Sequence, residues 1–388
     1  MTRVFINDFA VMSRLGMNRE ETLASLNSPS PPRPDEQFEL VDGETTMIAR
    51  LPGQLADAPS ARTRTNQMAS DLLGQMQPQL DWMKATFGAD RIAVIVGTST
   101  TGIEESLGSL KGRMEAGEWP EGFELKDQEL GDLAHHIGAA VGAEGTQYTI
   151  STACTSATKA MISGARLIRT GIADAVICGG IDSFSRLTVN GFHALSSVSA
   201  GQCSPFGAGR DGINIGEGGA LFILSREPSE WEVAGGSESS DAHHMSAPDP
   251  TGAQAERAVR DAMDQAGTNP DEVDFVHMHG TGTPLNDEAE AGLVMRVFGA
   301  DTPAMSTKGM TGHTLGAAGG LQVAINMICM EAGVYPPHVF NGDRDETLAP
   351  IRLSEIGETA DAPLVTSLCA SYAFGGSNAA LVLRRVSS

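Results

Sequence analysis

Short apolar segments alternate with helix-forming segments along most of this 388-residue chain. Beyond about residue 90, runs typical of buried strands are separated by stretches of ten or more residues typical of helices. Strands joined by crossovers of this length require an α/β fold with a mostly parallel sheet and right-handed connections. The predicted strands cover residues 91–96, 146–152, 173–179, 219–226, 232–236, 275–278, 304–307, 364–371 and 379–385. The predicted helices cover residues 62–87, 103–116, 128–141, 154–170, 253–266, 284–298 and 314–332.

Two distant segments indicate an internal duplication. Residues 218–226 and 377–385 each lead from a turn into an apolar strand that ends near an arginine. This similarity favours two related α/β halves, with a functional site where the halves meet.

The charge and the cysteines exclude several classes of protein. With 26 Lys and Arg against 49 Asp and Glu, the net charge is −23, so we expect no nucleic-acid binding. We expect no membrane span, because no apolar run approaches the length of one, and no export signal, because the N-terminus leads straight into a strand. Five cysteines without C-x-x-C spacing argue against a disulfide scaffold or zinc ribbon and favour the reducing cytoplasm.

Residues 151–157, Ser-Thr-Ala-Cys-Thr-Ser-Ala, combine a strand end, a corner of small residues and a helix start. We expect the helix to begin at or just after Cys154. A thiol at that point lies at the positive end of the helix dipole, which favours the nucleophilic thiolate. Position alone leaves a buried structural cysteine as the alternative.

Histidines occur in two further segments rich in small residues. His277 and His279 alternate with apolar neighbours, so we expect both to face one side of a strand. Such a pair can bind metal, but no third ligand stands at a suitable spacing, and we expect no metal site. His313 ends the segment Lys-Gly-Met-Thr-Gly-His, just before a Gly-rich helix start. The Gly-Lys-Ser/Thr order of a P-loop is absent, so close helix packing explains these glycines better than phosphate binding does.

The last segment of interest is residues 371–378, Ser-Tyr-Ala-Phe-Gly-Gly-Ser-Asn. Its glycines allow backbone N–H groups to face a ligand, although an ordinary hairpin turn has the same composition.

Together these four segments resemble the β-ketoacyl-acyl carrier protein synthases, the ketosynthases of fatty acid and polyketide synthesis. Elongating members carry T-A-C-S/T-S, H-G-T-x-T-P, K-x-x-x-G-H and a closing G-F-G-G-T/S-N loop. This chain has similar motifs in the same order, at residues 152–156, 279–284, 308–313 and 373–378. The resemblance covers most of the chain beyond about residue 91. It is to the elongating Cys-His-His class, rather than to Cys-His-Asn priming enzymes or to thiolases with a second catalytic cysteine.

The resemblance implies the thiolase fold, with two related α/β halves in five α-β-α-β-α layers. Residues 1–230 would form the half with the nucleophile, and residues 231–388 the half with two catalytic histidines. The implied reaction is the decarboxylative Claisen condensation of malonyl-acyl carrier protein with an enzyme-bound acyl chain. No cofactor is implied, since substrates arrive on the phosphopantetheine arm of acyl carrier protein. The implied assembly is a homodimer, or a heterodimer with a ketosynthase-like partner.

The resemblance also implies residue roles. Cys154 would accept the acyl chain, and the backbone N–H groups of Cys154 and Phe374 would form the oxyanion hole. His279 and His313, as neutral imidazoles, would donate Nε2–H to the enolate.

Lys308 matches the family lysine, whose role is electrostatic and structural. Elongating enzymes usually carry a carboxylate fourteen residues later, but here Gln322 stands at that position. This departure puts the usual Lys–Glu pair in doubt. Asp287 and Glu290, which follow the His279 loop, are candidate supports.

Residues 97–102 and 239–244 look like a subgroup associated with aryl polyene pigment gene clusters. Ser99 and Thr100 place hydroxyls where saturated fatty-acid enzymes carry Gly or an aliphatic residue. An unpaired buried hydroxyl costs about 1–3 kcal/mol, so each needs a partner. We expect a partly polar acyl pocket suited to a conjugated chain, unless both hydroxyls bond to their own backbone.

Two further pairs concern the carrier protein. Thr281 and Thr283 match hydroxyls that hold the phosphopantetheine arm. Because the chain and its carrier protein are both acidic, docking needs a local basic patch. Arg62 and Arg64 lie where the family often places docking cations, although a solvated helix face has the same pattern.

Three alternatives stay open. The chain could elongate fatty acids in primary metabolism, or it could be a mainly structural partner in a ketosynthase heterodimer. The family's chain-length factors lack the cysteine, whereas Cys154 is present here. A cysteine hydrolase has suitable residue types, but its usual local signatures are absent.

Overall fold

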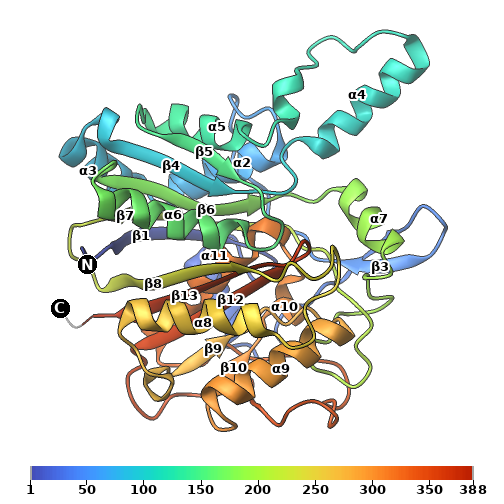
Figure 1. Ribbon diagram of the computed structural model, residues 1–388. Helices are drawn as coiled ribbons and strands as arrows, with labels where there is room; N and C mark the ends of the chain where they lie inside the picture. Colours follow the sequence, from blue (N-terminus) through green and yellow to red (C-terminus); the bar gives the residue numbers. More distant parts are fainter. Residues whose placement is uncertain (1, 387–388) are drawn as a thin grey trace.

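A computed structural model describes residues 2–386 as two layers of β-sheet packed between three layers of helices (Figure 1). Helices α6 and α11 lie between the sheets, and their core cluster includes side chains from strands of both halves. The helices are α1 (Arg19–Leu26), α2 (Arg64–Gln75), α3 (Gln77–Phe87), α4 (Ile103–Ala116), α5 (Asp132–Val141), α6 (Ser156–Thr170), α7 (Arg186–Ala194), α8 (Ala253–Ala266), α9 (Pro284–Phe298), α10 (Lys308–Thr311) and α11 (Ala318–Ala332).

The strands repeat one topology twice. The first half has the order β1-β7-β6-β4-β5 and the second has β8-β13-β12-β9-β10, so corresponding strands occupy corresponding places. A short pairing between β1 and β8 joins the halves. The strands are β1 (Phe5–Met12), β2 (Glu36–Glu39), β3 (Thr45–Ile48), β4 (Ile92–Gly97), β5 (Gln147–Ile150), β6 (Ala175–Asp182), β7 (Gly218–Ser225), β8 (Trp231–Ser240), β9 (Phe275–His277), β10 (Pro303–Met305), β11 (Arg352–Leu353), β12 (Thr366–Ala373) and β13 (Ser377–Arg385). The two-half thiolase fold implied by the motifs is confirmed.

The expectation of a mostly parallel sheet is wrong. Both halves place their last strand antiparallel to its neighbours, as in the pairings of β7 with β1 and β6 and of β13 with β8 and β12. In the second half, the three residues between β12 and β13 are too few for a crossover, so the chain can only turn back on itself.

Several predicted helices agree with the structure in both bounds, namely α4, α8 and α9. Others differ at their ends: α6 begins at Ser156, and a 3₁₀ turn at Leu315–Ala317 precedes α11. The predicted helix over residues 62–87 is two helices, divided at Met76. Sequence patterns missed α1 and α7.

One apolar segment is longer than the sequence analysis allowed. Residues Leu315–Ala332 have a mean hydropathy of 1.3 over 18 residues, which is long and apolar enough for a span. However, 89% of this segment is buried inside the protein, because it forms part of the middle layer. Its apolar character is therefore that of a core helix.

The two middle helices approach closely at Gly319 of α11. A Cβ added there would lie 1.9 Å from Thr158 Oγ1 on α6 and 3.0 Å from Ser371 Oγ. Thr158 Cβ is also only 3.2 Å away, so an added methyl group would force these side chains or the two helices apart, and glycine allows the observed close packing.

We predict that Gly319→Ala lowers the free energy of unfolding by about 1–3 kcal/mol, because it overpacks this contact. Removing the opposing hydroxyl with Thr158→Ala should recover part of the loss. Gly108→Ala on α4 is a matched control, since a Cβ there meets nothing within 4 Å. Its helix propensity should raise stability by about 0.5–1 kcal/mol. Urea unfolding measures all four proteins, and unchanged stability of Gly319→Ala would contradict the packing argument.

Candidate active site

Cys154 lies in the corner between β5 and α6, two residues before the helix begins. The residue before it, Ala153, has φ +50°, a strained conformation that residues other than glycine rarely adopt. Cys154 is buried, with 6% of its surface exposed, and its Sγ lies 3.0 Å from His313 Nε2. The strained corner thus holds a thiol against an imidazole from the other half of the chain.

His313 is fixed by hydrogen bonds to its backbone and to its ring. Its backbone N–H donates to the carbonyl of Asn214 at 2.7 Å, and its own carbonyl accepts from Gly216 at 3.0 Å. Nδ1 accepts the backbone N–H of Leu315 at 3.1 Å, which leaves the proton of the neutral ring on Nε2. Burial, with a contribution from Lys308, holds the pKa of His313 well below 6.5. A neutral Nε2–H therefore points at the thiol.

His279 follows β9 and presents its ring to the same space. The His279 and His313 ring centroids are 5.3 Å apart. Its backbone N–H and that of Gly280 each donate to the Glu290 carboxylate at 2.6 Å. Nδ1 of His279 lies 3.4 Å from Lys308 Nζ, an obligate donor when charged, so this ring also carries its proton on Nε2. Burial, with Lys308 next, holds its pKa well below 6.5.

The donor atoms of Cys154, His279 and His313 lie within 4.8 Å of one another, close enough for a metal ion. A metal on Nε2 requires each neutral ring to carry its proton on Nδ1. Both Nδ1 atoms instead face N–H donors, so these residues do not fit a metal.

The expectation that His277 and His279 face the same side is wrong. His277 bonds through Nδ1 to Asn326 at 2.7 Å and through Nε2 to Thr307 at 3.1 Å, away from the thiol. β9 ends at His277, so the alternation of a strand no longer applies at His279.

The expectation of a resting thiolate also needs correction. Burial raises the pKa of Cys154 to about 12, and the opposing effect of Lys308 is smaller. A helix start favours thiolate when water or donors reach the sulfur, whereas here the sulfur is enclosed. The free protein therefore holds a neutral thiol.

Lys308 is buried and donates to the backbone carbonyl of His279. Within residues 2–386, no carboxylate lies within 4.0 Å of its ammonium, and burial lowers its pKa. Gln322, which replaces the usual carboxylate, donates to the Met278 carbonyl at 2.7 Å and accepts from Ser371 at 3.3 Å. The substitution keeps a hydrogen bond to the end of β9 but removes a charge.

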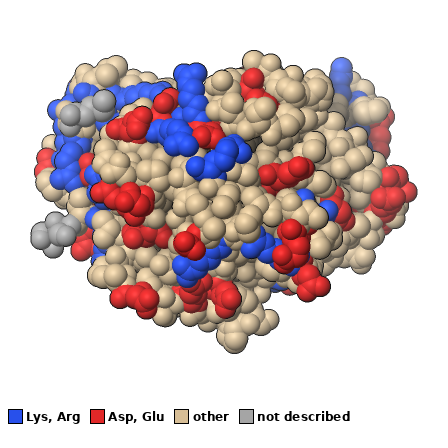
Figure 2. Space-filling view, turned by 60° about the horizontal axis from the view of Figure 1, so that its bottom comes forward, with Lys and Arg blue, Asp and Glu red and all other residues tan. Residues whose placement is uncertain are grey.

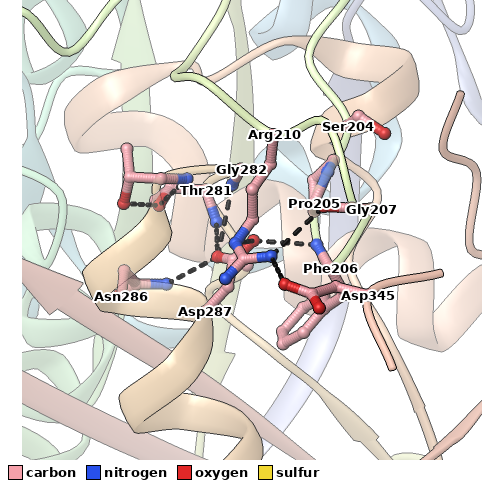
Figure 3. A network of polar contacts seen from close by, with 12 residues as sticks. Ser204, Pro205, Phe206, Gly207, Arg210, Thr281, Gly282, Asn286, Asp287 and Asp345 are labelled. Atoms are coloured by element: carbon pink, nitrogen blue, oxygen red, sulfur yellow. Dashed lines mark hydrogen bonds and ion pairs between the residues drawn. The ribbon is translucent and has the colours of Figure 1, made fainter. Parts of the chain in front are cut away.

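Asp287 supports the loop after His279 (Figure 3). It is fully buried, and its carboxylate accepts three backbone N–H groups at 2.8–3.2 Å, from Phe206, Thr281 and Gly282. Arg210, which pairs with Asp345, lies 3.9 Å away. Asp287 and Glu290, one turn apart on α9, thus hold the loop that carries His279, Thr281 and Thr283.

A cavity of about 400 Å³ opens onto the thiol and both imidazoles. Thr281, Thr283 and Phe374 also line it, and the two threonine hydroxyls are 2.9 Å apart. The backbone N–H groups of Cys154 and Phe374 donate to no other residue within 2–386. The cavity therefore brings together the thiol, two imidazole donors and two free backbone donors.

Ser99 and Thr100 do not line this cavity. The Thr100 hydroxyl donates to the buried carboxylate of Asp182 at 2.8 Å, which also accepts both backbone N–H groups of this segment. Burial raises the pKa of Asp182 to about 6. The Ser99 hydroxyl is buried without a partner among the described residues. Sequence reasoning missed Asp182, whose only signal is a carboxylate at the end of an apolar strand.

Arg62 and Arg64 are both paired with carboxylates. Arg62 contacts Asp127 at 2.9 Å and Glu124 at 3.3 Å, and Arg64 holds the fully buried Glu217 at 2.6 Å. On the face shown in Figure 2, basic side chains likewise lie beside acidic ones. Arg64 is therefore part of a structural ion pair, which it would have to keep while it also contacts a carrier protein.

Comparison with known proteins agrees with this geometry. The family models for the N-terminal and C-terminal domains of β-ketoacyl synthase match residues 78–229 and 231–341. The chain belongs to the β-ketoacyl synthase family. It is 33% identical over 330 residues to the tetracenomycin polyketide synthase ketoacyl synthase alpha subunit of Streptomyces glaucescens, covering 78% of this chain and 76% of that protein. It is 32% identical over 327 residues to 3-oxoacyl-[acyl-carrier-protein] synthase 2 of Staphylococcus aureus, covering 79% of this chain and 78% of that protein.

Solved ketosynthases share the whole fold. The ketosynthase ApeO of Xenorhabdus doucetiae, solved in complex with its chain length factor ApeC, superposes with a TM-score of 0.91 and 36% identity, covering 99% of this chain and 98% of that one. The ishigamide ketosynthase/chain length factor superposes with a TM-score of 0.86 and 26% sequence identity, and both chains are fully covered. This β-ketoacyl synthase is an acyltransferase-class condensing enzyme.

We predict that iodoacetamide labels Cys154 slowly at neutral pH and faster as pH rises beyond 8. The raised pKa leaves little thiolate below that range, and the alkylating agent reacts with thiolate. Mass spectrometry of timed samples gives the rate, and Cys154→Ala identifies the labelled site. A rate that reaches its plateau below pH 8 would contradict the neutral resting thiol.

Proposed function

We propose that this β-ketoacyl synthase condenses malonyl-acyl carrier protein with an acyl chain held on Cys154. The observation that carries the proposal is one buried cavity in which a thiol meets two Nε2–H donors from the other half of the chain. The intact set of donors favours a catalytic role over that of a mainly structural partner subunit.

In the first step, the Cys154 sulfur attacks the acyl thioester carbonyl and the carrier thiol leaves. The Nε2–H of His313 stabilises the developing negative charge on the sulfur, and the thiol proton ends on the leaving carrier thiolate, which departs as the thiol. The tetrahedral oxyanion needs donors, and the free backbone N–H groups of Cys154 and Phe374 can supply them.

In the second step, malonyl-acyl carrier protein loses CO₂ and leaves an enolate. His279 and His313 donate Nε2–H to its oxygen, and neighbouring Lys308 helps to keep both rings neutral. The enolate carbon then attacks the acyl carbonyl, a C–C bond forms, and the C–S bond breaks so that Cys154 leaves as a thiolate, which takes up one proton from solvent to restore the neutral thiol. Carbon and charge balance without an external oxidant or reductant, so the proposal includes no cofactor.

The phosphopantetheine arm would pass the hydroxyls of Thr281 and Thr283, which line the cavity. Docking of acyl carrier protein at Arg62 and Arg64 stays a proposal. Of the two, Arg62 suits the role better, because its carboxylate partners are partly exposed, whereas the Glu217 partner of Arg64 is fully buried.

We also propose a dimer, with a ketosynthase-like partner as in the ApeO–ApeC complex. The α4 segment projects from the body of the protein (Figure 1), and strand β5 is the last strand at one edge of the sheet. This segment comprises α4 and the residues that follow it up to 130, and its exposed apolar side chains are Leu110, Met114, Trp119, Leu125 and Leu130. Such a patch is typical of an interaction surface.

Five free cysteines fit the reducing cytoplasm, which we propose as the location of the protein.

For the pathway, we propose aryl polyene or related polyketide synthesis. The proposal is supported by sequence identity, which is 36% to ApeO and 32% to 3-oxoacyl-[acyl-carrier-protein] synthase 2. The latter relative keeps primary fatty-acid elongation as the second candidate.

We predict that Cys154→Ala abolishes condensation, because the covalent acyl intermediate cannot form. His279→Ala and His313→Ala should lose decarboxylation while Cys154 still accepts an acyl group slowly. Assays with malonyl- and acyl-acyl carrier protein separate the two half-reactions. The removal of each donor should cost about 10²–10³-fold in kcat. If either histidine variant decarboxylates at the wild-type rate, the donor role is wrong.

We predict that polyenoyl-acyl carrier protein is elongated faster than a saturated acyl substrate of the same length. Direct competition between the two substrates, read by mass spectrometry, gives the ratio of kcat/KM values. Equal or better use of the saturated chain would transfer the assignment to general fatty-acid elongation.

A further inference from the structure

Asp182 ends strand β6 in the first half of the fold, and it is fully buried. Its Oδ1 atom accepts four hydrogen bonds at 2.6–2.9 Å from residues 98–100, two from backbone N–H groups and two from threonine hydroxyls. Its Oδ2 atom accepts the backbone N–H of Ala317 at 3.1 Å. This one carboxylate therefore bonds to a segment of its own half and to a turn of the other half.

The turn on the Oδ2 side is the 3₁₀ turn Leu315–Ala317, which lies between His313 and α11. Leu315 has φ +50°, a conformation that residues other than glycine rarely adopt and that the surrounding contacts must hold in place. The Ala317 N–H also donates to the carbonyl of Thr314 at 3.0 Å, but that bond lies within the same segment and moves with it. The bond to Asp182, in contrast, ties the turn to the first half.

Gly316, in the middle of this turn, shows how closely the turn approaches the carboxylate. A Cβ added there would lie 2.9 Å from Asp182 Oδ2 and 3.0 Å from Ser99 Oγ. Four hydrogen bonds hold the Asp182 carboxylate on its other side, so an added methyl group would displace the turn rather than the carboxylate. The position of the turn therefore depends on Asp182.

The first residue of the turn sets the position of the proton on a candidate catalytic ring. Leu315 N–H donates to His313 Nδ1 at 3.1 Å, so the ring carries its proton on Nε2, which lies 3.0 Å from the Cys154 sulfur. The Leu315 N–H points at the ring only while the strained conformation of the turn is kept. Asp182 does not line the cavity, yet it is connected to His313 through this turn.

We propose that Asp182 is a positioning residue: through the turn Leu315–Ala317, it keeps His313 in the tautomer that donates Nε2–H to the enolate. The use of that proton rests on the proposed condensing function, whereas the tautomer can be measured without substrate. His279 does not depend on this turn, because its Nδ1 faces the Lys308 ammonium. His279 is therefore an internal control.

The test perturbs the contact from each half of the fold. In Asp182→Asn, the amide oxygen suits the four donors at the Oδ1 position, which leaves the NH₂ group facing the Ala317 N–H, donor against donor. Gly316→Ala places a methyl group against the same contact from the other side. Glu232→Gln is the matched control, because it also converts a buried carboxylate into an amide, but its partner is Arg3 at the start of the chain.

Nitrogen NMR of isotope-labelled histidine distinguishes the two neutral tautomers, and His279→Ala and His313→Ala assign the signals. We expect the wild type and Glu232→Gln to hold both rings as Nε2–H. In Asp182→Asn and Gly316→Ala, His313 should populate both tautomers while His279 stays unchanged. Decarboxylation of malonyl-acyl carrier protein by these two variants should fall about three- to tenfold, as expected for the loss of one neutral hydrogen bond.

Two results would overturn the inference. If His313 stays entirely Nε2–H in Asp182→Asn, the carboxylate does not control the ring, whatever the melting temperature. If the signals of His279 and His313 change together, the substitution loosens the whole site and Asp182 is only structural. Gly316→Ala decides between the same outcomes if Asp182→Asn does not fold. Neither result affects the proposed function, which fails if the wild type does not condense its substrates or if Cys154→Ala still does.

Discussion

The close packing of α6 against α11 is the constraint on which the rest of the structure depends. These helices come from different halves, and Gly319 lets them meet where any side chain would collide with Thr158. Cys154 lies just before α6 and His313 just before α11, so their packing brings the sulfur and the imidazole to 3.0 Å. The contact between the halves therefore creates the site.

Burial then determines the chemistry of the groups that meet there. It raises the pKa of Cys154 and lowers those of His279 and His313, so all three are neutral in the free protein. Nδ1 of His313 faces a backbone N–H and Nδ1 of His279 faces the Lys308 ammonium, so each ring carries its proton on Nε2, which faces the cavity. An enolate oxygen meets preorganised donors there without the need to move charge first.

Much of the fold could be predicted from local patterns. The bounds of α4, α8 and α9 follow from apolar periodicity and flanking turns, and the duplication was visible in two strand ends. The antiparallel last strand of each half could not be read from residues 218–225 or 377–385, because an apolar strand has no preferred neighbour until the sheet forms. Likewise, the alternation rule failed for His279 because β9 ends two residues earlier.

For the site, the sequence by itself indicated the family and the candidate residues, since Cys154, His279, Lys308 and His313 stand in specific linked motifs. Tertiary structure decided their states and surroundings. Only the folded chain shows that the thiol is neutral, that Thr100 turns to Asp182 rather than to the cavity, and that Arg64 holds a buried Glu217. Each of these depends on desolvation or on a partner more than eighty residues away, and neither is encoded in local spacing.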